Sequence, residues 1–340
     1  MIVKVATDVS LEPYNTFGVT ARAAHFATIA SADELAALLD QPRYGAMPRL
    51  VLGGGSNLLL TRDFDGLVIK LATKGIERLG RSDGVERVRV GAAENWHTTV
   101  ERLLHDGLPG LENLALIPGE VGAAPIQNIG AYGVELAERF VELDAFDVEQ
   151  RRVVRFDAAA CHFGYRDSAF KHRSRGDLII LSVTLGVPVE WQAVVGYVDV
   201  AAELRTRGVD RPAAREVFDA VVAIRRRKLP DPAVIGNAGS FFKNPVVARD
   251  VRNSLIEKFP SLVSYDLGGA RCKLAAGWLI EACGLKGAVR GCAAVYEKQA
   301  LVLVNRGGAT GAEILALARE VQEKVQERFG IQLEPEPTIV

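Results

Sequence analysis

The stretch LIPGEVGAAPIQNIGAYG, residues 116–133, interrupts a region that otherwise reads as strands and turns. Its content of glycine, alanine and proline is too high for a helix or strand to continue through it. Gln127 and Asn128 add amide donors and acceptors, and Tyr132 adds an aromatic hydroxyl. Such a segment can lie flat against a planar heterocycle and offer backbone hydrogen bonds to its edge. Small residues more often indicate an irregular packed loop, but a loop this long usually carries a function.

The pattern on both sides of this stretch is mixed. Strands with turns dominate from about residue 67 to 200, with a short helix expected around residues 95–106. Residues 211–232 predict a helix, because Pro212 stands near its start and prolines follow its end.

Two capping boxes predict helices near the two ends of the chain. Ser31 is followed by Glu34, and Thr310 by Glu313, at the spacing in which a hydroxyl and a carboxylate bind each other's backbone N–H groups. Gly330 is expected to end the second of these helices. The sequence therefore predicts an α+β protein in three parts.

Length and charge limit the functions that are expected. The 340 residues are too many for one ordinary core. The 41 basic residues balance 42 acidic ones, which leaves no global basic field for nucleic acid. No apolar run approaches the roughly 18 residues that span a bilayer, and Asp8 and Glu12 stand where a signal peptide would be apolar. We therefore expect a cytoplasmic monomer that has neither a nucleic-acid nor a membrane partner.

The cysteines and histidines predict no metal site. None of the four cysteines forms a C-x-x-C pair, and the five histidines are scattered without a ligand spacing. We expect the cysteines to be reduced and mostly buried. They are Cys161, Cys272, Cys283 and Cys292.

A second glycine-rich stretch, Gly53-Gly54-Gly55-Ser56-Asn57, follows an apolar run. Consecutive glycines let the backbone approach a ligand closely, and successive N–H groups can form a concave site for a phosphate. The stretch lacks the G-K-[ST] of a P-loop and the third glycine of the Rossmann fingerprint. A tight hairpin turn explains it equally well.

Two basic features have ordinary explanations beside functional ones. Arg166 lies between Tyr165 and Asp167, where a guanidinium could bind a substrate carboxylate through two N–H groups. A surface Arg–Asp pair is the simpler reading of this tripeptide. The run from Arg225 to Lys228 fits a solvated helix end, although one of its members could point inward and bind a phosphate.

Ser240, in GNAGSFFKNP (residues 236–245), does not fit the pattern of a nucleophile. The G-x-S-x-G elbow is absent, and no histidine follows within the chain. A serine hydroxyl is a very weak acid, so it donates usefully only to a very basic atom such as a carbanion. Addition of a hydride from a flavin to a carbon–carbon double bond generates such an atom. The alternative is a structural role, in which the Ser240 hydroxyl hydrogen-bonds to the backbone of its loop.

Taken together, these motifs resemble the UDP-N-acetylenolpyruvoylglucosamine reductase (MurB) family over residues 11 to 336. The long stretch GNAGSFFKNP is specific, whereas GGGSN alone is not. The motifs are NTFG (15–18), GGGSN (53–57), IPG (117–119), QNIGAYG (127–133), YRDS (165–168), KLPDP (228–232), GNAGSFFKNP (236–245), AAGWLIEACGLKG (275–287) and EKQALVLVN (297–305).

The resemblance implies a flavoenzyme with three parts. An FAD-binding region of the vanillyl-alcohol-oxidase type would comprise residues 1–66, joined by 330–340, and residues 67–226. Residues 227–329 would form an α+β domain that binds the substrate. NADPH, as co-substrate, would reduce FAD, and the enolpyruvyl ether of UDP-N-acetylglucosamine would then take the hydride on its methylene carbon. A proton on the neighbouring carbon would complete UDP-N-acetylmuramate for peptidoglycan.

The resemblance also implies roles for single residues. Ser240 would be the proton donor, Arg166 would lie near the reacting carboxylate, and Glu336 would share a proton with the enolic intermediate. Tyr197 sits in WQAVVGYVDV, the extra loop of the longer family type. The remaining substrate ligands would be Tyr197, Lys228, Asn244 and Gln299. The cofactor ligands would be Gly53, Gly54, Gly55, Ser56, Asn57, Pro118, Gly119, Gly122, Gln127 and Asn128.

Glu336 stands between two prolines, Pro335 and Pro337. Pro337, which follows it, cannot donate a hydrogen bond to a β-ladder. Glu336 is then either loosely held or rigidly directed by the prolines on both sides.

Two other functions stay open on the sequence alone. Another FAD-dependent oxidoreductase on the same scaffold would explain the glycine-rich stretches but not Tyr197, Lys228 and Ser240 together. A non-catalytic flavin or sugar-nucleotide binding protein would be expected to lack one of Arg166, Ser240 or Glu336.

Overall fold

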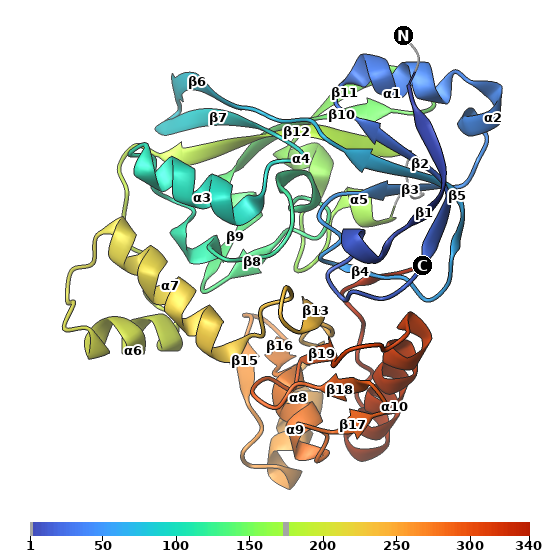
Figure 1. Ribbon diagram of the computed structural model, residues 1–340. Helices are drawn as coiled ribbons and strands as arrows, with labels where there is room; N and C mark the ends of the chain where they lie inside the picture. The colour runs from blue at the N-terminus through green and yellow to red at the C-terminus, as the bar shows by residue number, and fades with distance from the viewer. Residues whose placement is uncertain (1–2, 173–176) are drawn as a thin grey trace. The chain divides into compact units, whose positions relative to one another are not determined.

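The structure is a computed structural model that describes residues 3–172 and 177–340 (Figure 1). Its contacts divide the chain into two compact units. Unit 1 comprises Met1–Val9, Arg22–Gly55 and Phe64–Arg227, and unit 2 comprises Ser10–Ala21, Ser56–Asp63 and Lys228–Val340. Segments that are distant in the sequence therefore share each unit. The subdivision expected from the sequence, with boundaries at residues 66, 226 and 329, stays a prediction.

Among its described residues, unit 1 contains two large sheets and the two-stranded sheet β8-β9. The first has the strand order β1-β2-β5-β3, with β2 parallel to β5 and β5 parallel to β3. The second has the order β11-β10-β12-β7-β6, and all of its pairs are antiparallel. The strands are β1 (Val5–Ser10), β2 (Arg22–Ile29), β3 (Arg49–Leu52), β5 (Phe64–Leu71), β6 (Ile76–Ser82), β7 (Val85–Gly91), β10 (Phe140–Asp147), β11 (Arg152–Asp157) and β12 (Leu178–Pro188).

One continuous apolar core joins both sheets of unit 1 with its helices. Helix α1 (Ala32–Leu39) packs against both β2 and β11 and so connects the two sheets. The other helices are α2 (Pro42–Gly45), α3 (Trp96–His105), α4 (Ala158–Cys161), α5 (Ala169–His172), α6 (Val198–Thr206) and α7 (Ala214–Lys228), of which Lys228 already belongs to unit 2.

The stretch at 116–133 is an ordered loop built from short turns. The turn η3 (Val121–Ala123) lies against β7 and β12, which fixes the stretch on the five-stranded sheet. The remaining short elements around it are η2 (Glu112–Leu114), β8 (Gly130–Ala131), β9 (Val134–Glu135) and η4 (Leu136–Arg139).

Unit 2 contains three small sheets and three helices. Helix α10 (Gly311–Phe329) packs against β18 and β19, as Figure 1 shows in red. The strand orders are β13-β19-β18-β17, β14-β16-β15 and β20-β4. The elements are η1 (Glu12–Tyr14), β4 (Leu58–Leu59), β13 (Gly236–Ser240), β14 (Val246–Ala248), α8 (Arg249–Lys258), β15 (Ser264–Asp266), β16 (Arg271–Leu274), α9 (Ala276–Ala282), β17 (Val289–Arg290), β18 (Ala293–Val295), β19 (Val302–Asn305) and β20 (Thr338–Ile339).

The structure tests the two predicted capping boxes. At α10 both bonds form, and Gly330 ends the helix with φ +67°, as predicted. At α1 the Ser31 hydroxyl accepts from the Glu34 N–H at 3.1 Å, but the Glu34 carboxylate accepts from Ala30 instead of Ser31. The box at α1 is therefore incomplete, because the Glu34 carboxylate binds the N–H of Ala30, the residue before Ser31.

The prediction that the cysteines are mostly buried is only half correct. All four are free, but Cys283 is half-buried and Cys292 is exposed, whereas Cys161 and Cys272 are buried. Burial raises the pKa of the Cys161 thiol to about 12, which keeps it protonated.

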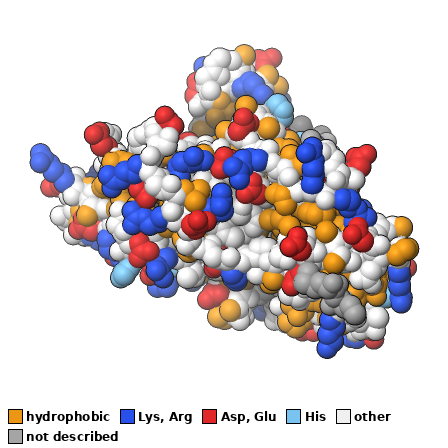
Figure 2. All heavy atoms as spheres, turned by 90° about the horizontal axis from the view of Figure 1, so that it is seen from above, with side chains coloured by type: hydrophobic (Ala, Val, Ile, Leu, Met, Phe, Trp, Pro, Cys, Tyr) orange, Lys and Arg blue, Asp and Glu red, His pale blue; other side chains and the backbone are white. Residues whose placement is uncertain are grey.

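The surface shows no single-sign field on the face in Figure 2, where acidic and basic side chains alternate. Within residues 3–172 and 177–340, no helix has both the length and the apolar character that crossing a bilayer requires. The same residues contain no group of three His, Cys, Asp or Glu side chains placed to hold a metal ion.

Candidate active site

The two glycine-rich stretches that the sequence singled out meet in unit 1. A Cβ atom on Gly54 would lie 3.2 Å from Gly119 Cα, and one on Gly53 would lie 3.3 Å from Glu120 Oε2. These contacts are tighter than most Cβ contacts, so glycine favours the close approach of the two loops. The residues Gly53, Gly54 and Gly119 therefore lie close together.

A buried carboxylate borders this site. Glu120 Oε1 accepts from Lys70 Nζ at 2.7 Å, and both side chains are mostly buried. Glu120 Oε2 is buried without a hydrogen-bond partner in the described part of the chain. Buried polar atoms are normally paired, so this oxygen is suited to a ligand that donates, such as a ribityl or ribose hydroxyl.

FAD fits this set of groups. The backbone N–H groups of the glycine turn suit its phosphates, and Glu120 Oε2 suits a hydroxyl of its sugar or ribityl chain. Sequence reasoning missed Lys70 and Glu120. A lysine inside the apolar strand GLVIKLA (residues 66–72) was the signal that could have revealed them, because a buried lysine requires a partner.

Backbone conformation marks residues 116–133 as a special segment. Leu116, Asn128 and Tyr132 all have positive φ, at 58°, 43° and 49°. This region is costly for leucine and tyrosine, and such residues cluster at functional sites.

Asn128 supports the site through protein contacts. Its Nδ2 donates to Glu135 Oε2 at 2.9 Å and to Gly164 O at 3.0 Å, and its Oδ1 accepts from the Ala137 N–H at 2.9 Å. The side chain is fully engaged, so a contact between Asn128 and a cofactor would come from its backbone.

The other predicted cofactor residues of this segment differ in exposure and packing. Pro118 is exposed and Gln127 is half-buried. A Cβ atom on Gly122 would lie 3.1 Å from Ala92 Cα, so Gly122 is needed for packing whether or not it touches a cofactor.

Arg166 occupies a tight turn in unit 1. Gly164 and Asp167 exchange both backbone hydrogen bonds, and Arg166 between them has φ +53°. Its Nη2 donates to Gly130 O at 2.8 Å, which ties the turn to the 116–133 stretch. Ser168 strengthens this tie, because its hydroxyl donates to Ile126 O at 2.7 Å.

Asp167 does not depend on Arg166 for a partner. Its carboxylate lies 2.7 Å from His172 Nε2. The local reading of an Arg166–Asp167 surface pair therefore does not explain the turn.

Arg225 is the inward-pointing member of the basic run at the end of α7. Its Nε donates to Leu116 O at 3.2 Å, and its guanidinium is hydrogen-bonded to the Tyr132 hydroxyl. Burial lowers the pKa of Arg225 and raises that of Tyr132. Arg227, in contrast, pairs with Glu203 at the surface.

Ser240 ends strand β13 in unit 2, immediately after a bulge. Asn237 pairs with Val304 and Ser240 with Val302, so β13 has one more residue than β19 over this interval. Gly239, with φ +69°, supplies the left-handed residue. A bulge of this type redirects the following side chain, and such features occur next to active sites. Unit 2 contains no histidine that could act as a base for Ser240.

Glu336 is held beside Ser240 by three segments of unit 2. The Glu336 N–H donates to Phe241 O at 2.8 Å, and Asn57 Nδ2 donates to Glu336 O at 3.3 Å. Beyond Pro337, β20 pairs in parallel with β4. Of the two expectations for Glu336, the structure supports a firmly held residue.

The same contacts place Asn57 beside Glu336. Asn57 O also accepts from the Thr338 N–H at 2.9 Å. Ser56 and Asn57 belong to unit 2, whereas the three glycines before them belong to unit 1.

Asn244 and Gln299 each lie at the first turn of α9. Asn244 Oδ1 accepts from the Ala276 N–H at 2.9 Å, which leaves its NH₂ group as the end that can face a ligand. A Cβ atom on Gly277 would lie 3.1 Å from Gln299 Oε1. The structure thus brings together these two predicted substrate residues. Lys228 is the last residue of α7, and Tyr197 precedes α6 in unit 1.

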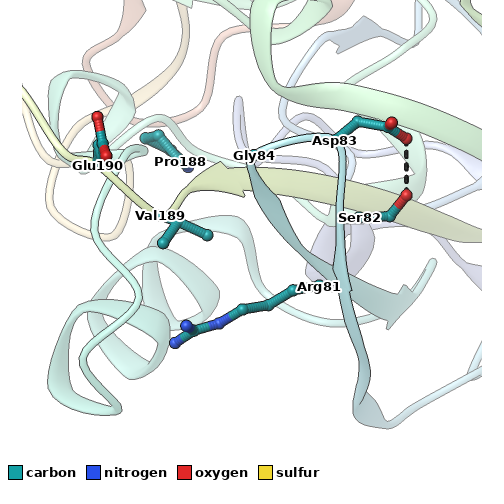
Figure 3. A pocket seen from close by; sticks show the side chains of 7 residues that line it. All are labelled: Arg81, Ser82, Asp83, Gly84, Pro188, Val189 and Glu190. Atoms are coloured by element: carbon teal, nitrogen blue, oxygen red, sulfur yellow. Dashed lines mark hydrogen bonds between the residues drawn. The ribbon is translucent and has the colours of Figure 1, made fainter.

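An open depression of about 460 Å³ lies elsewhere, at the β6–β7 turn and the end of β12 (Figure 3). None of the residues that line it is a predicted site residue, and its side chains are those of an ordinary strand end. It is not the candidate site. The lining residues are Arg81, Ser82, Asp83, Gly84, Pro188, Val189 and Glu190.

Comparison with known proteins agrees with this geometry. A family model described as an FAD binding domain matches residues 23–156, and one described as the C-terminal domain of UDP-N-acetylenolpyruvoylglucosamine reductase matches residues 231–340. The expected α+β class, with an FAD-binding region and a separate C-terminal domain, is thereby confirmed.

Full-length relatives carry the same name. A UDP-N-acetylenolpyruvoylglucosamine reductase of Burkholderia mallei is 55% identical over 337 residues, which cover 98% of this chain and 97% of that protein. One from Ralstonia nicotianae is 54% identical and covers 96% of each chain. The crystal structure of the corresponding reductase from Thermus caldophilus is 26% identical, with a TM-score of 0.67 and coverage of 100% of this chain and 99% of that chain.

Proposed function

Because this chain belongs to the UDP-N-acetylenolpyruvoylglucosamine reductase family and is an FAD-dependent oxidoreductase of peptidoglycan precursor synthesis, we propose how its own residues carry out the reaction. FAD is its cofactor and NADPH its co-substrate. Its substrate is a small UDP-sugar. We propose that the protein is cytoplasmic, because its substrates are water-soluble and polar, and that it is a monomer.

FAD, which the glycine turn at residues 53–57 and the stretch from Pro118 to Asn128 would hold, would supply the hydride that the methylene carbon of the enolpyruvyl group receives; the hydride would originate from NADPH. Ser240 donates its hydroxyl proton to the neighbouring carbon, the one that bears the carboxylate and the ether oxygen. The carbon–carbon π bond breaks and two C–H bonds form, and the serine regains its proton from solvent. A carbon with carbanion character is basic enough to accept a proton from so weak an acid.

Arg166 stabilises the charge that develops during this step. Negative charge moves toward the substrate carboxylate as the hydride arrives, so a preformed cation stabilises the transition state more than the ground state. The bond from Arg166 to Gly130 O and the turn around it orient the guanidinium before the substrate binds.

Glu336 acts together with Ser240. It shares a proton with the enolic oxygen of the substrate carboxylate and so assists the protonation of the carbon. The observation that carries the proposal is the hydrogen bond from the Glu336 N–H to Phe241 O, which fixes the glutamate one residue from the bulged Ser240.

The remaining residues recognise the nucleotide sugar. Tyr197 and Lys228 bind the diphosphate as a hydroxyl donor and a cation. Asn244 and Gln299, which each lie at the first turn of α9, contact the substrate through their amides. FAD is held by the glycine turn at residues 53–57 and by the stretch from Pro118 to Asn128.

The test is a product analysis with matched substrates. The FAD-loaded protein is given NADPH and either the enolpyruvyl ether of UDP-N-acetylglucosamine or the same sugar ether without UDP. We expect a product two hydrogens heavier than the substrate, formed from the UDP compound alone. Oxidation of NADPH that depends on oxygen and not on the nucleotide sugar would instead identify another FAD-dependent oxidoreductase.

A further inference from the structure

The loop at residues 189–197, here called the tyrosine loop, connects β12 to α6 in unit 1. Residues 189–196 contain neither helix nor strand, and the loop ends at Tyr197. The side chain of Tyr197 is partly exposed, at 40%. A loop that lacks the regular backbone hydrogen bonds of a helix or strand needs contacts with other residues to keep its side chains in one position.

Asn113 supplies one such anchor. It is only 2% exposed, and its Nδ2 donates to Val194 O at 2.8 Å and to Tyr132 O at 2.9 Å. A primary amide has two N–H donors, and both are used here. One side chain in η2 therefore joins the tyrosine loop to the 116–133 stretch.

Glu112 supplies a second anchor from the neighbouring position. It is 3% exposed, and its carboxylate accepts from the Gly110 N–H at 2.7 Å and from Trp191 Nε1. The hydrogen bond from Trp191 Nε1 therefore ties the indole to a buried side chain. The tyrosine loop is thus fixed at Trp191 and again at Val194.

The backbone anchors continue into the side chain of Tyr197. The rings of Tyr132 and Tyr197 meet edge to face, with centroids 5.2 Å apart and an angle of 84° between them. Asn113 holds the backbone of Tyr132 and the backbone three residues before Tyr197. It therefore fixes both members of the aromatic pair.

We propose that Asn113, assisted by Glu112, is a positioning residue that holds Tyr197 ready for the diphosphate of the nucleotide sugar. This inference rests on the substrate role of Tyr197 given above. Asn113 acts through the loop and touches neither substrate nor cofactor. Its loss should weaken binding of the nucleotide sugar while the reduction of FAD by NADPH continues.

The experiment compares Asn113→Ala, Tyr197→Phe and the double variant in the FAD-loaded protein. Tyr197→Phe should raise KM for the UDP-sugar about tenfold, the loss expected for one interaction of about 1.4 kcal/mol. Asn113→Ala should raise the same KM by a similar factor and change kcat less than about twofold. The KM of the double variant should be no higher than that of the more impaired single variant, because both substitutions remove the same interaction.

A matched control separates positioning from a general loss of packing. Thr99 is 1% exposed, and its hydroxyl donates to Asn95 O at 2.8 Å, away from the tyrosine loop. Thr99→Val should leave KM for the UDP-sugar unchanged. Amide hydrogen exchange of residues 190–196 without substrate should accelerate in Asn113→Ala but not in Thr99→Val. If Asn113→Ala does not fold, Trp191→Phe removes the Glu112 anchor and should have the same effects.

The outcomes separate this inference from the proposed function. If Tyr197→Phe raises KM but Asn113→Ala changes neither KM nor exchange of the loop, the positioning role of Asn113 is wrong. If Tyr197→Phe itself leaves KM unchanged, the substrate role of Tyr197 is wrong and the inference falls with it. The inference is supported if Asn113→Ala raises KM and accelerates exchange of the loop while Thr99→Val does neither.

Discussion

At the scale of single residues, the account depends on Ser240 as an acid. Ser240→Ala should leave reduction of FAD by NADPH nearly intact, because that step needs no proton from the serine. Turnover should fall by about 10²–10⁴-fold, the usual contribution of one positioned proton donor. Rapid-mixing measurements of the two half-reactions check this.

Ser254→Ala is the control for Ser240, because Ser254 is an exposed residue of α8. It should behave as the unaltered protein does. Normal turnover in Ser240→Ala would show that the proton comes from elsewhere.

A substitution of Arg166 tests whether the substrate carboxylate requires the geometry of a guanidinium or only a positive charge. Arg166→Lys keeps the charge but loses the two-point contact and the bond to Gly130 O, so kcat/KM for the UDP-sugar should fall by about 10²–10³-fold. Arg155→Lys, at an exposed pair with Asp144, should change little. Equal activity of Arg166→Lys and the unaltered protein would mean that a point charge suffices.

At the scale of elements, the bulge in β13 should control catalysis through one glycine. Gly239→Ala meets no atom within 4 Å, so its effect comes from φ +69° alone. This strain costs about 1–2 kcal/mol and should lower Tm and, by turning Ser240, also turnover.

Gly330→Ala is a matched control, since Gly330 has φ +67° and equally open surroundings but ends α10. It should lower Tm to a similar extent and leave kcat unchanged. A parallel loss of kcat in both variants would show that the bulge has no special role.

The contact between α3 and α7 predicts a dependence of stability on pH. His97 stacks on Phe218, and its Nδ1 accepts from the Leu116 N–H at 3.1 Å. Burial lowers its pKa from the usual 6.5. The unfolded chain therefore binds a proton at a higher pH than the folded protein does. The contribution of neutral His97 to the free energy of unfolding is complete above pH 6.5 and is lost as the pH falls below it.

His97→Gln should reduce the loss of stability between about pH 7 and about pH 5, measured as the shift of the urea midpoint. His105→Gln changes an exposed histidine of the same helix and should keep the full loss. An unchanged pH profile in His97→Gln would show that another group is responsible.

Helix ends could be predicted from the sequence where residues a few positions apart determine them. The hydroxyl and carboxylate of Thr310 and Glu313 sit three residues apart, and the box that they form was read directly from the sequence. Ser31 and Glu34 have the same spacing, yet Glu34 turns to Ala30, because the chain before the helix offers a second N–H group. The bulge at Gly239 was not predicted, because it depends on the register between β13 and β19.

At the scale of the whole molecule, the site depends on contacts between remote segments. Asn57 and Glu336 are 279 positions apart, and parallel pairing of β4 with β20 brings them together. No local periodicity encodes such a pairing, so the sequence reached Glu336 only through its resemblance to a family. The sequence analysis predicted no role for Lys70, Glu120 or Asn113 for the same reason, because their hydrogen-bond partners lie far away in the sequence.

The measurement that tests the central claim most directly is an anaerobic visible spectrum of the FAD-loaded protein during two additions. NADPH should bleach the flavin band, and the enolpyruvyl ether of UDP-N-acetylglucosamine should then restore it. A flavin that bleaches with NADPH but stays bleached after the nucleotide sugar is added would contradict the account.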